Sequence, residues 1–396
     1  MPAFVPVILT LIAALISVPV AVFLVEVIAA AVRCRDRLSL TAQQGPRGRL
    51  AVLIPAHDES KGLVPTLTDV KQQLHLGDRV LVVADNCTDD TAAIARTHGA
   101  EVIERHDSSR RGKGFALAFG ISHLDSDPPD IVVMIDADCR LASHAIDEVV
   151  GVCATTRRPV QALYLMTSSA DAQINHQVAE FAWRVKNLLR PLGLKALGLP
   201  CQLMGTGMAF PWEVLQSADL ATSSIVEDLK LGLDLAANGY PPLFCPSACV
   251  TSQFGASARA ARTQRERWEH GHLHAIITLA PKLLYRAAMA RNWNLLTLTL
   301  DLAVPPLSLI AILVFGMFMA TAALQIIGYS SIAFPISSAS LLGFILAVGI
   351  AWQNCGRSCL PLRSVFLIVP HVIRKLGLYR RSSNRGWVRT DRSRSE

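Results

Sequence analysis

A pair of aspartates directly follows a run of apolar residues, at a position suited to holding a cation. The run Val132–Ile135 leads into Asp136, and Asp138 stands two residues later. Two carboxylates at alternate positions beyond a strand end can share a divalent cation, which can also bind a diphosphate. An Asp-x-Asp sequence is common by chance, but its place at the end of a buried strand favours a metal and diphosphate site.

Two earlier hydrophobic segments also end in acidic loops. The first loop contains Glu59 and the second contains Asp85. Residues just past a strand of an α/β sheet face the ligand crevice rather than the core. The alternative is structural, because Asp58, Thr88 or Asp89 could each cap a following helix. Two such loops in tandem favour a binding site.

Gln264, Arg267 and Trp268 fall at positions i, i+3 and i+4 of the helix-like run Ala256–Ile277. That spacing places an amide, a guanidinium and an indole on one helical face. The amide can form hydrogen bonds, the guanidinium can bind a diphosphate, and the indole offers a flat surface to a sugar ring. The alternative is a solvated or membrane-surface helix.

A candidate general base lies in the pair Glu227 and Asp228, which opens a predicted helix, Leu229–Asn238. A carboxylate there could take a proton from an attacking hydroxyl. It could also simply stabilise the helix through its dipole. Upstream, the small residues of Gly205–Met208 would let an acceptor approach the backbone closely.

The segment Arg110–Gly114 is a basic, glycine-rich helix start. It lacks the spacing of a nucleotide-binding P-loop. Lys113 and the backbone amides could still contact phosphate, although a plain turn explains the segment equally well.

Short hydrophobic segments alternate with amphipathic ones from Leu50 to about Val250, which predicts an α/β domain with a parallel sheet. The carboxyl ends of parallel strands meet at one edge, so the acidic loops should lie together there. The predicted strands are Leu50–Pro55, Arg79–Ala84, Ala100–Arg105, Ile131–Ile135 and Val160–Tyr164. The predicted helices between them are Ser60–Gln73, Asp89–His98, Gly112–Leu124 and Ala142–Ala154.

The composition favours a membrane protein, since the 396 residues are 51% hydrophobic and have a mean hydropathy of +0.36. Met1–Val25 and Leu302–Gly356 contain no charged residue, and a membrane helix needs about 20 residues. The first run fits one retained span, and the second fits two spans separated near Gly328–Ser338. The positive-inside bias places these flanking residues in the cytoplasm: Arg33, Arg35, Arg37, Arg374, Lys375, Arg380, Arg381, Arg385, Arg389, Arg392 and Arg394.

The net charge of +7 comes largely from these membrane-flanking clusters. Lipid headgroups are therefore the expected partner, and the chain lacks the basic groove with interleaved aromatic residues that nucleic-acid binding needs. The nine cysteines form no CxxC pair and have no histidine companions, which is typical of ordinary buried thiols in a reducing compartment.

Taken in order, these motifs resemble the family 2 glycosyltransferases, especially the membrane-embedded branch with cellulose, chitin, hyaluronan and poly-N-acetylglucosamine synthases. The resemblance covers roughly Leu50–Ile277 and the membrane arrangement. It implies the GT-A fold and transfer of a sugar from a nucleotide diphosphate, usually UDP, with inversion at the anomeric carbon. The motifs are the loop His57-Asp58-Glu59, Asp85, Asp136-Ala137-Asp138, Gly205-Thr206-Gly207, Glu227-Asp228 and Gln264-Arg265-Glu266-Arg267-Trp268.

The resemblance implies roles for the residues of the donor side. Pro55, Glu59 and Asp85 would surround the nucleoside. Asp136 and Asp138 would make the ribose and metal-diphosphate contacts, with Mg²⁺ or Mn²⁺ bound chiefly by Asp138.

It also implies roles on the acceptor side. Asp228, the second residue of the Glu227-Asp228 pair, would deprotonate the acceptor hydroxyl. Gln264 and Arg267 would bind the acceptor end and the departing diphosphate, and Trp268 would stack on the acceptor sugar. A diphosphate leaving group needs positive charge, and the attacking hydroxyl needs a base on the opposite side of the anomeric carbon.

We therefore expect a multi-pass glycosyltransferase of the bacterial inner membrane with its catalytic domain in the cytoplasm. The expected segments are an N-terminal anchor (1–32), a linker (33–49), the GT-A domain (50–255), the Gln-x-x-Arg-Trp and interfacial helices (256–294), two transmembrane helices (295–327 and 332–355), and an interfacial segment with a basic tail (356–396).

Two departures from the family bear on the product. The first loop has Asp58 where relatives often have Asn, and two C-terminal spans are fewer than the larger polymer-secreting synthases use. The leading hypothesis is transfer to a saccharide in cell-surface or extracellular polysaccharide synthesis, possibly with an export partner subunit. The alternative enzyme is non-processive and adds a single sugar to a polyprenyl phosphate or lipid. A membrane channel or scaffold whose cytoplasmic domain senses nucleotide is a third hypothesis.

Overall fold

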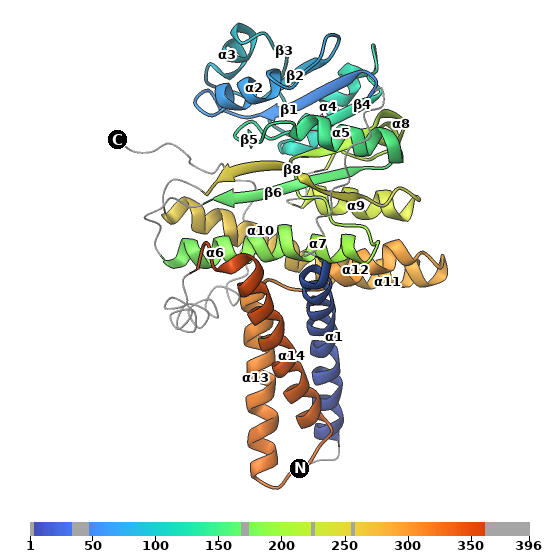
Figure 1. Cartoon of the computed structure of the whole chain (residues 1–396), viewed down its shortest axis with the longest axis vertical. Coiled ribbons are helices and arrows are strands. Elements are labelled where there is room, and N and C mark those ends of the chain that lie inside the picture. Colours follow the sequence, from blue (N-terminus) through green and yellow to red (C-terminus); the bar gives the residue numbers. More distant parts are fainter. Residues whose placement is uncertain (1–3, 34–46, 168–173, 223–225, 255–257, 361–396) are drawn as a thin grey trace.

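The computed structural model describes residues 4–33, 47–167, 174–222, 226–254 and 258–360. A domain built around one sheet lies at one end, and three long helices project from the other (Figure 1). A layer of helices separates the two parts. Most of the predicted linker 33–49 and the basic tail lie outside the described residues, as do Arg35 and Arg37.

The sheet contains eight strands in the order β3-β2-β1-β4-β7-β6-β8-β5. β1 pairs in parallel with β2 and β4, β2 with β3, and β6 with β8, whereas β7 and β5 run in the opposite direction to their neighbours. The predicted α/β fold with a mostly parallel sheet is confirmed. The strands are β1 (Leu50–Ala56), β2 (Arg79–Asp85), β3 (Glu101–Arg105), β4 (Ile131–Met134), β5 (Arg140–Leu141), β6 (Val160–Thr167), β7 (Met208–Pro211) and β8 (Leu243–Gln253).

The central strands are apolar on both faces because helices cover both sides of the sheet. Val52 and Ile54 of β1 belong to one hydrophobic core, and Ala51 and Leu53 belong to the other. The first core includes residues of α2 (Leu63–Lys71), α3 (Thr91–Thr97) and α5 (Ala145–Thr156). The second includes residues of α4 (Lys113–Leu124), α8 (Trp212–Gln216) and α9 (Glu227–Ala237).

All five predicted strands and the four predicted helices between them exist, with ends shifted by a few residues. The strands β5, β7 and β8 were missed. β7 has only four residues, and β8 contains Pro246 and pairs with β6 across a register shift at Ala162 and Leu163. Such short or irregular strands carry little periodic signal.

The layer between the sheet and the long helices is made of amphipathic helices. Its members from the middle of the chain, all missed in the sequence, are α6 (Ile174–Arg184), the π-helical turn η1 (Val185–Leu189) and α7 (Arg190–Ala196). The later members are α10 (Ala258–Thr278), α11 (Ala280–Met289) and α12 (Trp293–Leu302).

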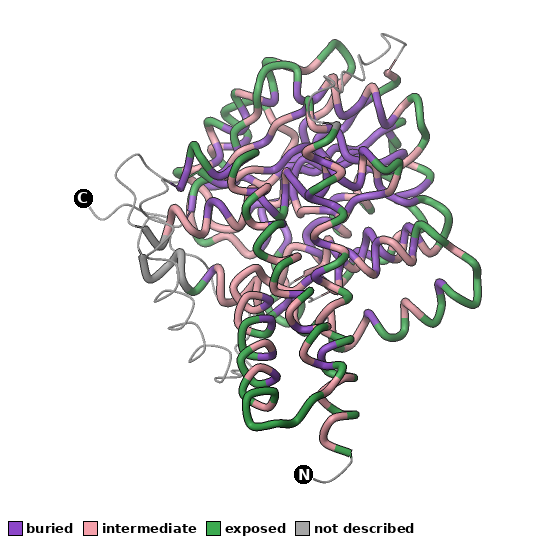
Figure 2. Tube along the Cα trace, turned by 60° about the horizontal axis from the view of Figure 1, so that its bottom comes forward, coloured by how far each residue is buried: buried purple, intermediate pink, exposed green. Residues whose placement is uncertain are grey.

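Three helices are long and apolar enough to cross a membrane, within the spans Phe4–Val32, Leu307–Ile326 and Ala333–Gly356. They belong to α1 (Phe4–Arg33), α13 (Leu307–Ile326), and α14 (Ala333–Ala351) with its π-helical end η2 (Trp352–Gly356). Figure 2 shows mostly exposed or half-buried residues along them, as expected for surfaces that contact lipid.

The boundary predicted for the second span, 295–327, was wrong. The apolar residues up to Leu302 form the separate helix α12, and α13 begins only at Leu307. Pro305 and Pro306 explain the break, because proline lacks the N–H that a continuing helix needs. Apolar composition alone does not reveal such an interruption.

A buried ion network joins two helices of the layer beneath the sheet, α7 and α12, to the long helix α1. The guanidinium of Arg190 in α7 donates to Glu26 Oε2 of α1 at 2.6 Å and to the backbone oxygen of Asp301 in α12 at 2.8 Å. It also pairs with the Asp301 carboxylate, and all three side chains are buried. Nearby, α7 packs so closely on α1 that a Cβ on Gly193 would lie 1.9 Å from the backbone oxygen of Glu26.

We expect Arg190→Leu to destabilise the protein by about 3–5 kcal/mol, because it leaves two buried carboxylates without their cation. Unfolding in detergent micelles measures this. Arg96→Leu is the control, since it removes an ion pair with Glu104 whose side chains are 51% and 40% exposed. Little change is expected there. Equal stability of the two variants would contradict the role given to the network.

Candidate functional site

A pocket of about 200 Å³ lies at the carboxyl ends of β1, β2 and β4. Parallel strands bring their terminal loops together at this edge of the sheet, as predicted. The predicted residues that line it are Pro55, Glu59, Asp85, Lys113, Asp136, Asp138 and Arg267. We call it the donor pocket.

Lys113 is fixed at the rim of the donor pocket by two partners. Its ammonium pairs with Asp136 and donates to the backbone oxygen of Gly205 at 2.7 Å. Burial lowers the pKa of Lys113, but the attraction of Asp136, Glu227 and Asp228 raises it above the ordinary value overall. The side chain is therefore a permanent positive charge, not merely part of a turn.

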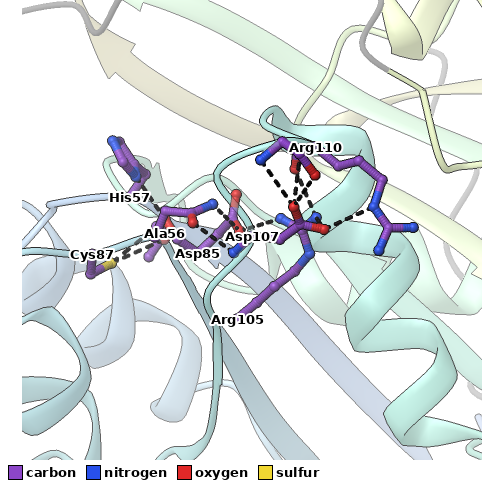
Figure 3. Close-up of polar contacts among 9 residues, drawn as sticks. Ala56, His57, Asp85, Cys87, Arg105, Asp107 and Arg110 are labelled. Carbon is purple, nitrogen blue, oxygen red and sulfur yellow. Dashed lines mark hydrogen bonds and ion pairs between the residues drawn. The ribbon is translucent and has the colours of Figure 1, made fainter.

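Asp85 is held by an arginine that the sequence did not single out (Figure 3). Arg105 Nη1 lies 2.6 Å from Asp85 Oδ1, and both side chains are 9% exposed. These residues stand opposite each other at the ends of β2 and β3, so a correct strand register would have revealed the pair. Asp107 and the Arg110 backbone oxygen also bind Arg105, which fixes the loop before Lys113.

Asp136, Asp138 and Cys139 have ligand atoms within 4.8 Å of one another, close enough to hold one metal ion. Burial raises the pKa of the Cys139 thiol to about 12, so it stays protonated and is a poor ligand. The two carboxylates are the oxygen ligands that Mg²⁺ and Mn²⁺ prefer. Asp136 also pairs with Lys113, so its carboxylate would be shared between the ammonium and a bound cation.

A second group, Asp58, Cys87 and Asp89, is also compact. Asp58 accepts from the Thr88 N–H at 2.6 Å, and Asp89 accepts from the N–H groups of Ser60 and Thr91 at 3.1 and 3.0 Å. These bonds tie the two acidic loops together. Asp89 thus contacts the start of the helix that follows it, α3, whereas the bond from Thr88 to Asp58 runs between the loops and is not the predicted helix cap.

A larger cavity of about 760 Å³, the catalytic cavity, adjoins the donor pocket. The residues that line both are Arg111, Gly112, Lys113, Asp136 and Arg267. Arg111 was not among the predicted site residues. The predicted residues Glu227, Asp228, Gln264 and Trp268 line the catalytic cavity.

Glu227 and Asp228, at the start of α9, line the catalytic cavity together with the carboxylates of Asp136 and Asp301. Burial and the charge of Asp228 raise the pKa of Glu227, and burial raises the pKa of Asp228 against the attraction of Lys186 and Lys113. Asp228 lies beside Gly205, where a Cβ would stand 3.4 Å from Oδ2. Raised carboxyl pKa values in a cavity are typical of acid–base groups.

The face of α10 that carries Gln264, Arg267 and Trp268 points into the catalytic cavity rather than to solvent. Gln264 is 2% exposed, and its Oε1 has no hydrogen-bond partner among the described residues. Oε1 of Gln202 also has no hydrogen-bond partner among the described residues. Gln202 lines the same cavity, and the sequence did not indicate it. Buried acceptors without partners are costly, so a ligand that donates hydrogen bonds would satisfy them.

Trp268 packs against another aromatic residue of the cavity wall. Its ring lies 5.0 Å from that of Trp183 in α6, with the planes inclined by 41°. The sequence did not indicate Trp183. The two indoles form an apolar wall that both supports α10 and faces the cavity.

Comparisons with known proteins place the chain in a family. A family model described as Glycosyltransferase like family 2 matches residues 46–271. The 4,4'-diaponeurosporenoate glycosyltransferase of Staphylococcus haemolyticus is 28% identical over 197 residues, covering 46% of this chain and 50% of the relative. The probable glycosyltransferase YdaM of Bacillus subtilis is 24% identical over 247 residues, covering 58% and 56%. The match thus spans about half the length of these relatives.

A solved structure is similar in fold: the mannosyltransferase PcManGT from Pyrobaculum calidifontis, in complex with GDP-Man and Mn²⁺. Its TM-score is 0.53 at 17% identity, and the alignment covers 87% of this chain and 98% of that chain. This likeness supports the GT-A-like fold. The family model covers more than half of the chain, including the acidic loops of both cavities, so the protein belongs to the glycosyltransferase family 2-like proteins.

Proposed function

We propose that this enzyme transfers a sugar from a nucleotide diphosphate to an acceptor hydroxyl, with inversion, on the cytoplasmic face of a bacterial inner membrane. The observation that carries the proposal is the shared wall of the two cavities. Lys113, Asp136 and Arg267 line both, so a diphosphate in the donor pocket would place its sugar beside Asp228.

In this mechanism Asp228 takes the proton from the acceptor hydroxyl, and the oxygen attacks the anomeric carbon. The bond from that carbon to the diphosphate oxygen breaks, and the diphosphate leaves with the electron pair. Lys113 and Arg267 stabilise the charge that develops on it. A hydroxyl attacking from the side opposite the diphosphate gives inversion.

A divalent cation, Mg²⁺ or Mn²⁺, would be held by Asp138 with Asp136 and would neutralise further charge on the diphosphate. The oxygen donor set and the protonated thiol of Cys139 fit a hard cation. The archaeal mannosyltransferase of similar fold is in complex with Mn²⁺, in line with this cofactor.

Pro55, Glu59 and Asp85 would bind the nucleoside, because they line the donor pocket but not the catalytic cavity. The sequence predicts a UDP-sugar. Since the archaeal mannosyltransferase binds GDP-Man, the donor screen should include UDP-glucose, UDP-N-acetylglucosamine, UDP-galactose and GDP-mannose.

The acceptor would occupy the catalytic cavity, where Gln202 and Gln264 offer acceptors for its hydroxyl groups and Trp268 offers an aromatic surface. This arrangement supports the proposal that the enzyme is one of the Gln-x-x-Arg-Trp membrane synthases. The three apolar spans would anchor the glycosyltransferase domain at the membrane surface.

We expect Asp228→Asn to abolish release of the nucleotide from the donor, because the amide cannot take a proton, while the nucleotide still binds. The rate of nucleotide release is measured with purified protein in detergent, and nucleotide binding is measured by calorimetry. Asp234→Asn on the same helix is the matched control, since the side chain of Asp234 is 44% exposed and pairs with Lys230. Unchanged release by Asp228→Asn would remove Asp228 from the mechanism.

The rate of transfer should fall as the pH drops through the raised pKa of Asp228, above the usual aspartate value of about 3.9. The base must be deprotonated, and Lys186 lowers its pKa. Lys186→Gln should therefore shift the acidic limb of the kcat/KM profile to higher pH. Lys282→Gln, an exposed lysine of α11, should not. A shift to lower pH, or no shift, would contradict this arrangement.

Asp138→Asn should weaken Mn²⁺ binding in the presence of UDP by roughly 10–100-fold, because it removes the principal charged ligand. Electron paramagnetic resonance of free Mn²⁺ measures the affinity. Asp125→Asn, at the exposed end of α4, is the control and should bind Mn²⁺ normally. Normal binding by Asp138→Asn would show that the metal is held elsewhere.

A further inference from the structure

A third cavity, of about 250 Å³, lies where the three membrane helices meet the interfacial layer. Its walls come from the domain-facing ends of α1, α13 and α14 and from α6 and α10 (Figure 1). They are mainly apolar, and their charged members are Lys186, Arg190, Arg265 and Glu269. The apolar lining includes Phe23, Phe181, Pro305, Ala311, Phe344 and Val348. We call it the membrane cavity.

The membrane cavity adjoins the catalytic cavity, and the two share part of their walls. Trp183, Lys186, Arg190, Trp268 and His272 line both. A molecule in the membrane cavity would therefore reach past the two indoles toward Asp228. Apolar walls cannot replace the hydrogen bonds that a sugar makes with water, so they suit a hydrocarbon chain better.

One positive charge at the junction is available to an anionic group. Arg190 is already paired with Glu26 and Asp301. His272 lies 2.9 Å from the Leu302 backbone oxygen, and burial lowers its pKa to about 3, so it is neutral. The Nζ atom of Lys186 lies over the Trp183 ring, 6.0 Å from the ring centroid. Among the described residues, no carboxylate lies within ion-pair distance of it. Burial lowers the pKa of Lys186, and the charge of Asp228 opposes that shift. Lys186 lines both cavities at the junction.

We propose that the acceptor is a lipid-linked saccharide. Its hydrocarbon chain lies in the membrane cavity, its phosphate or diphosphate contacts Lys186, and its sugar lies in the catalytic cavity with the accepting hydroxyl at Asp228. This inference rests on the proposed function, and it names the acceptor class that function leaves open. The chemistry is unchanged: the hydroxyl proton goes to Asp228, and the nucleotide diphosphate leaves the donor sugar.

The saccharide end of this acceptor agrees with the two unsatisfied amide oxygens. Gln202 and Gln264 line the catalytic cavity and not the membrane cavity, and their buried Oε1 atoms have no hydrogen-bond partner among the described residues. Hydroxyl groups belong beside them, whereas the hydrocarbon belongs beside Phe181 and Phe344. The order of apolar wall, cation and amide acceptors matches the order of chain, phosphate and sugar.

The test uses farnesyl phosphate that carries a photoreactive diazirine, with full-length protein in detergent. Cross-linked peptides should come from the membrane cavity. Ala311→Trp fills that cavity and should weaken labelling about tenfold or more. Ala320→Trp, an exposed position further along α13, should label like the unchanged protein. Equal labelling of the two variants would overturn the proposal.

Lys186→Gln should weaken binding of farnesyl phosphate by roughly 10–100-fold, while Lys282→Gln should not. The diazirine derivative of farnesol, which has no phosphate, should bind both proteins equally weakly. Competition by inorganic phosphate at the concentration effective for farnesyl phosphate would instead indicate a site for free phosphate. An unlabelled cavity in the unchanged protein would assign it to another occupant, such as residues 361–396 or a second copy.

Nucleotide release from the donor is measured in the same preparations. Labelling at the membrane cavity without metal-dependent nucleotide release from any donor would refute the proposed function alone. Nucleotide release together with unlabelled membrane helices, or with equal effects of Ala311→Trp and Ala320→Trp, would refute the lipid-linked acceptor alone.

Discussion

The buried charge of Arg190 is the constraint on which the arrangement of the two halves depends. Its guanidinium meets a carboxylate of α1 and one of α12, which are far apart in the sequence. A buried cation with two anionic partners allows few alternative packings, because any other packing leaves a charge unpaired. The close approach of Gly193 to α1 adds a steric requirement at the same place. The catalytic cavity therefore has a fixed height above the membrane helices.

The catalytic cavity lies between the other two cavities and shares a wall with each of them. In the proposed function, the residues of each shared wall would contact the ligands on both sides. Lys113, Asp136 and Arg267 separate donor pocket from catalytic cavity, while Trp183 and Lys186 separate catalytic from membrane cavity. This arrangement lets one helix, α10, serve several tasks. It is both the interfacial helix and the cavity wall that the spacing of Gln264, Arg267 and Trp268 left as alternatives.

The parts that could be predicted are those that local pattern determines. Apolar runs followed by Glu59, Asp85 and Asp136 predicted both the parallel strands and the meeting of these carboxylates, because parallel strand ends share one edge. Contacts that depend on strand register or on packing between distant elements could not be predicted. The pairing of Arg105 with Asp85 depends on the register of β2 and β3, and the contact of Trp183 with Trp268 depends on the packing of α6 against α10.

The position of Lys113 has a consequence for the energetics of the reaction. Its ammonium is bound by a carboxylate and by the carbonyl of Gly205 before any substrate is present. A side chain fixed in this way does not have to reorient when negative charge builds up beside it, so little reorganisation energy is added to the barrier. In the proposed reaction the carbonyl of Gly205, whose φ is +91°, would therefore contribute without touching the substrate, by holding the charge of Lys113 in place.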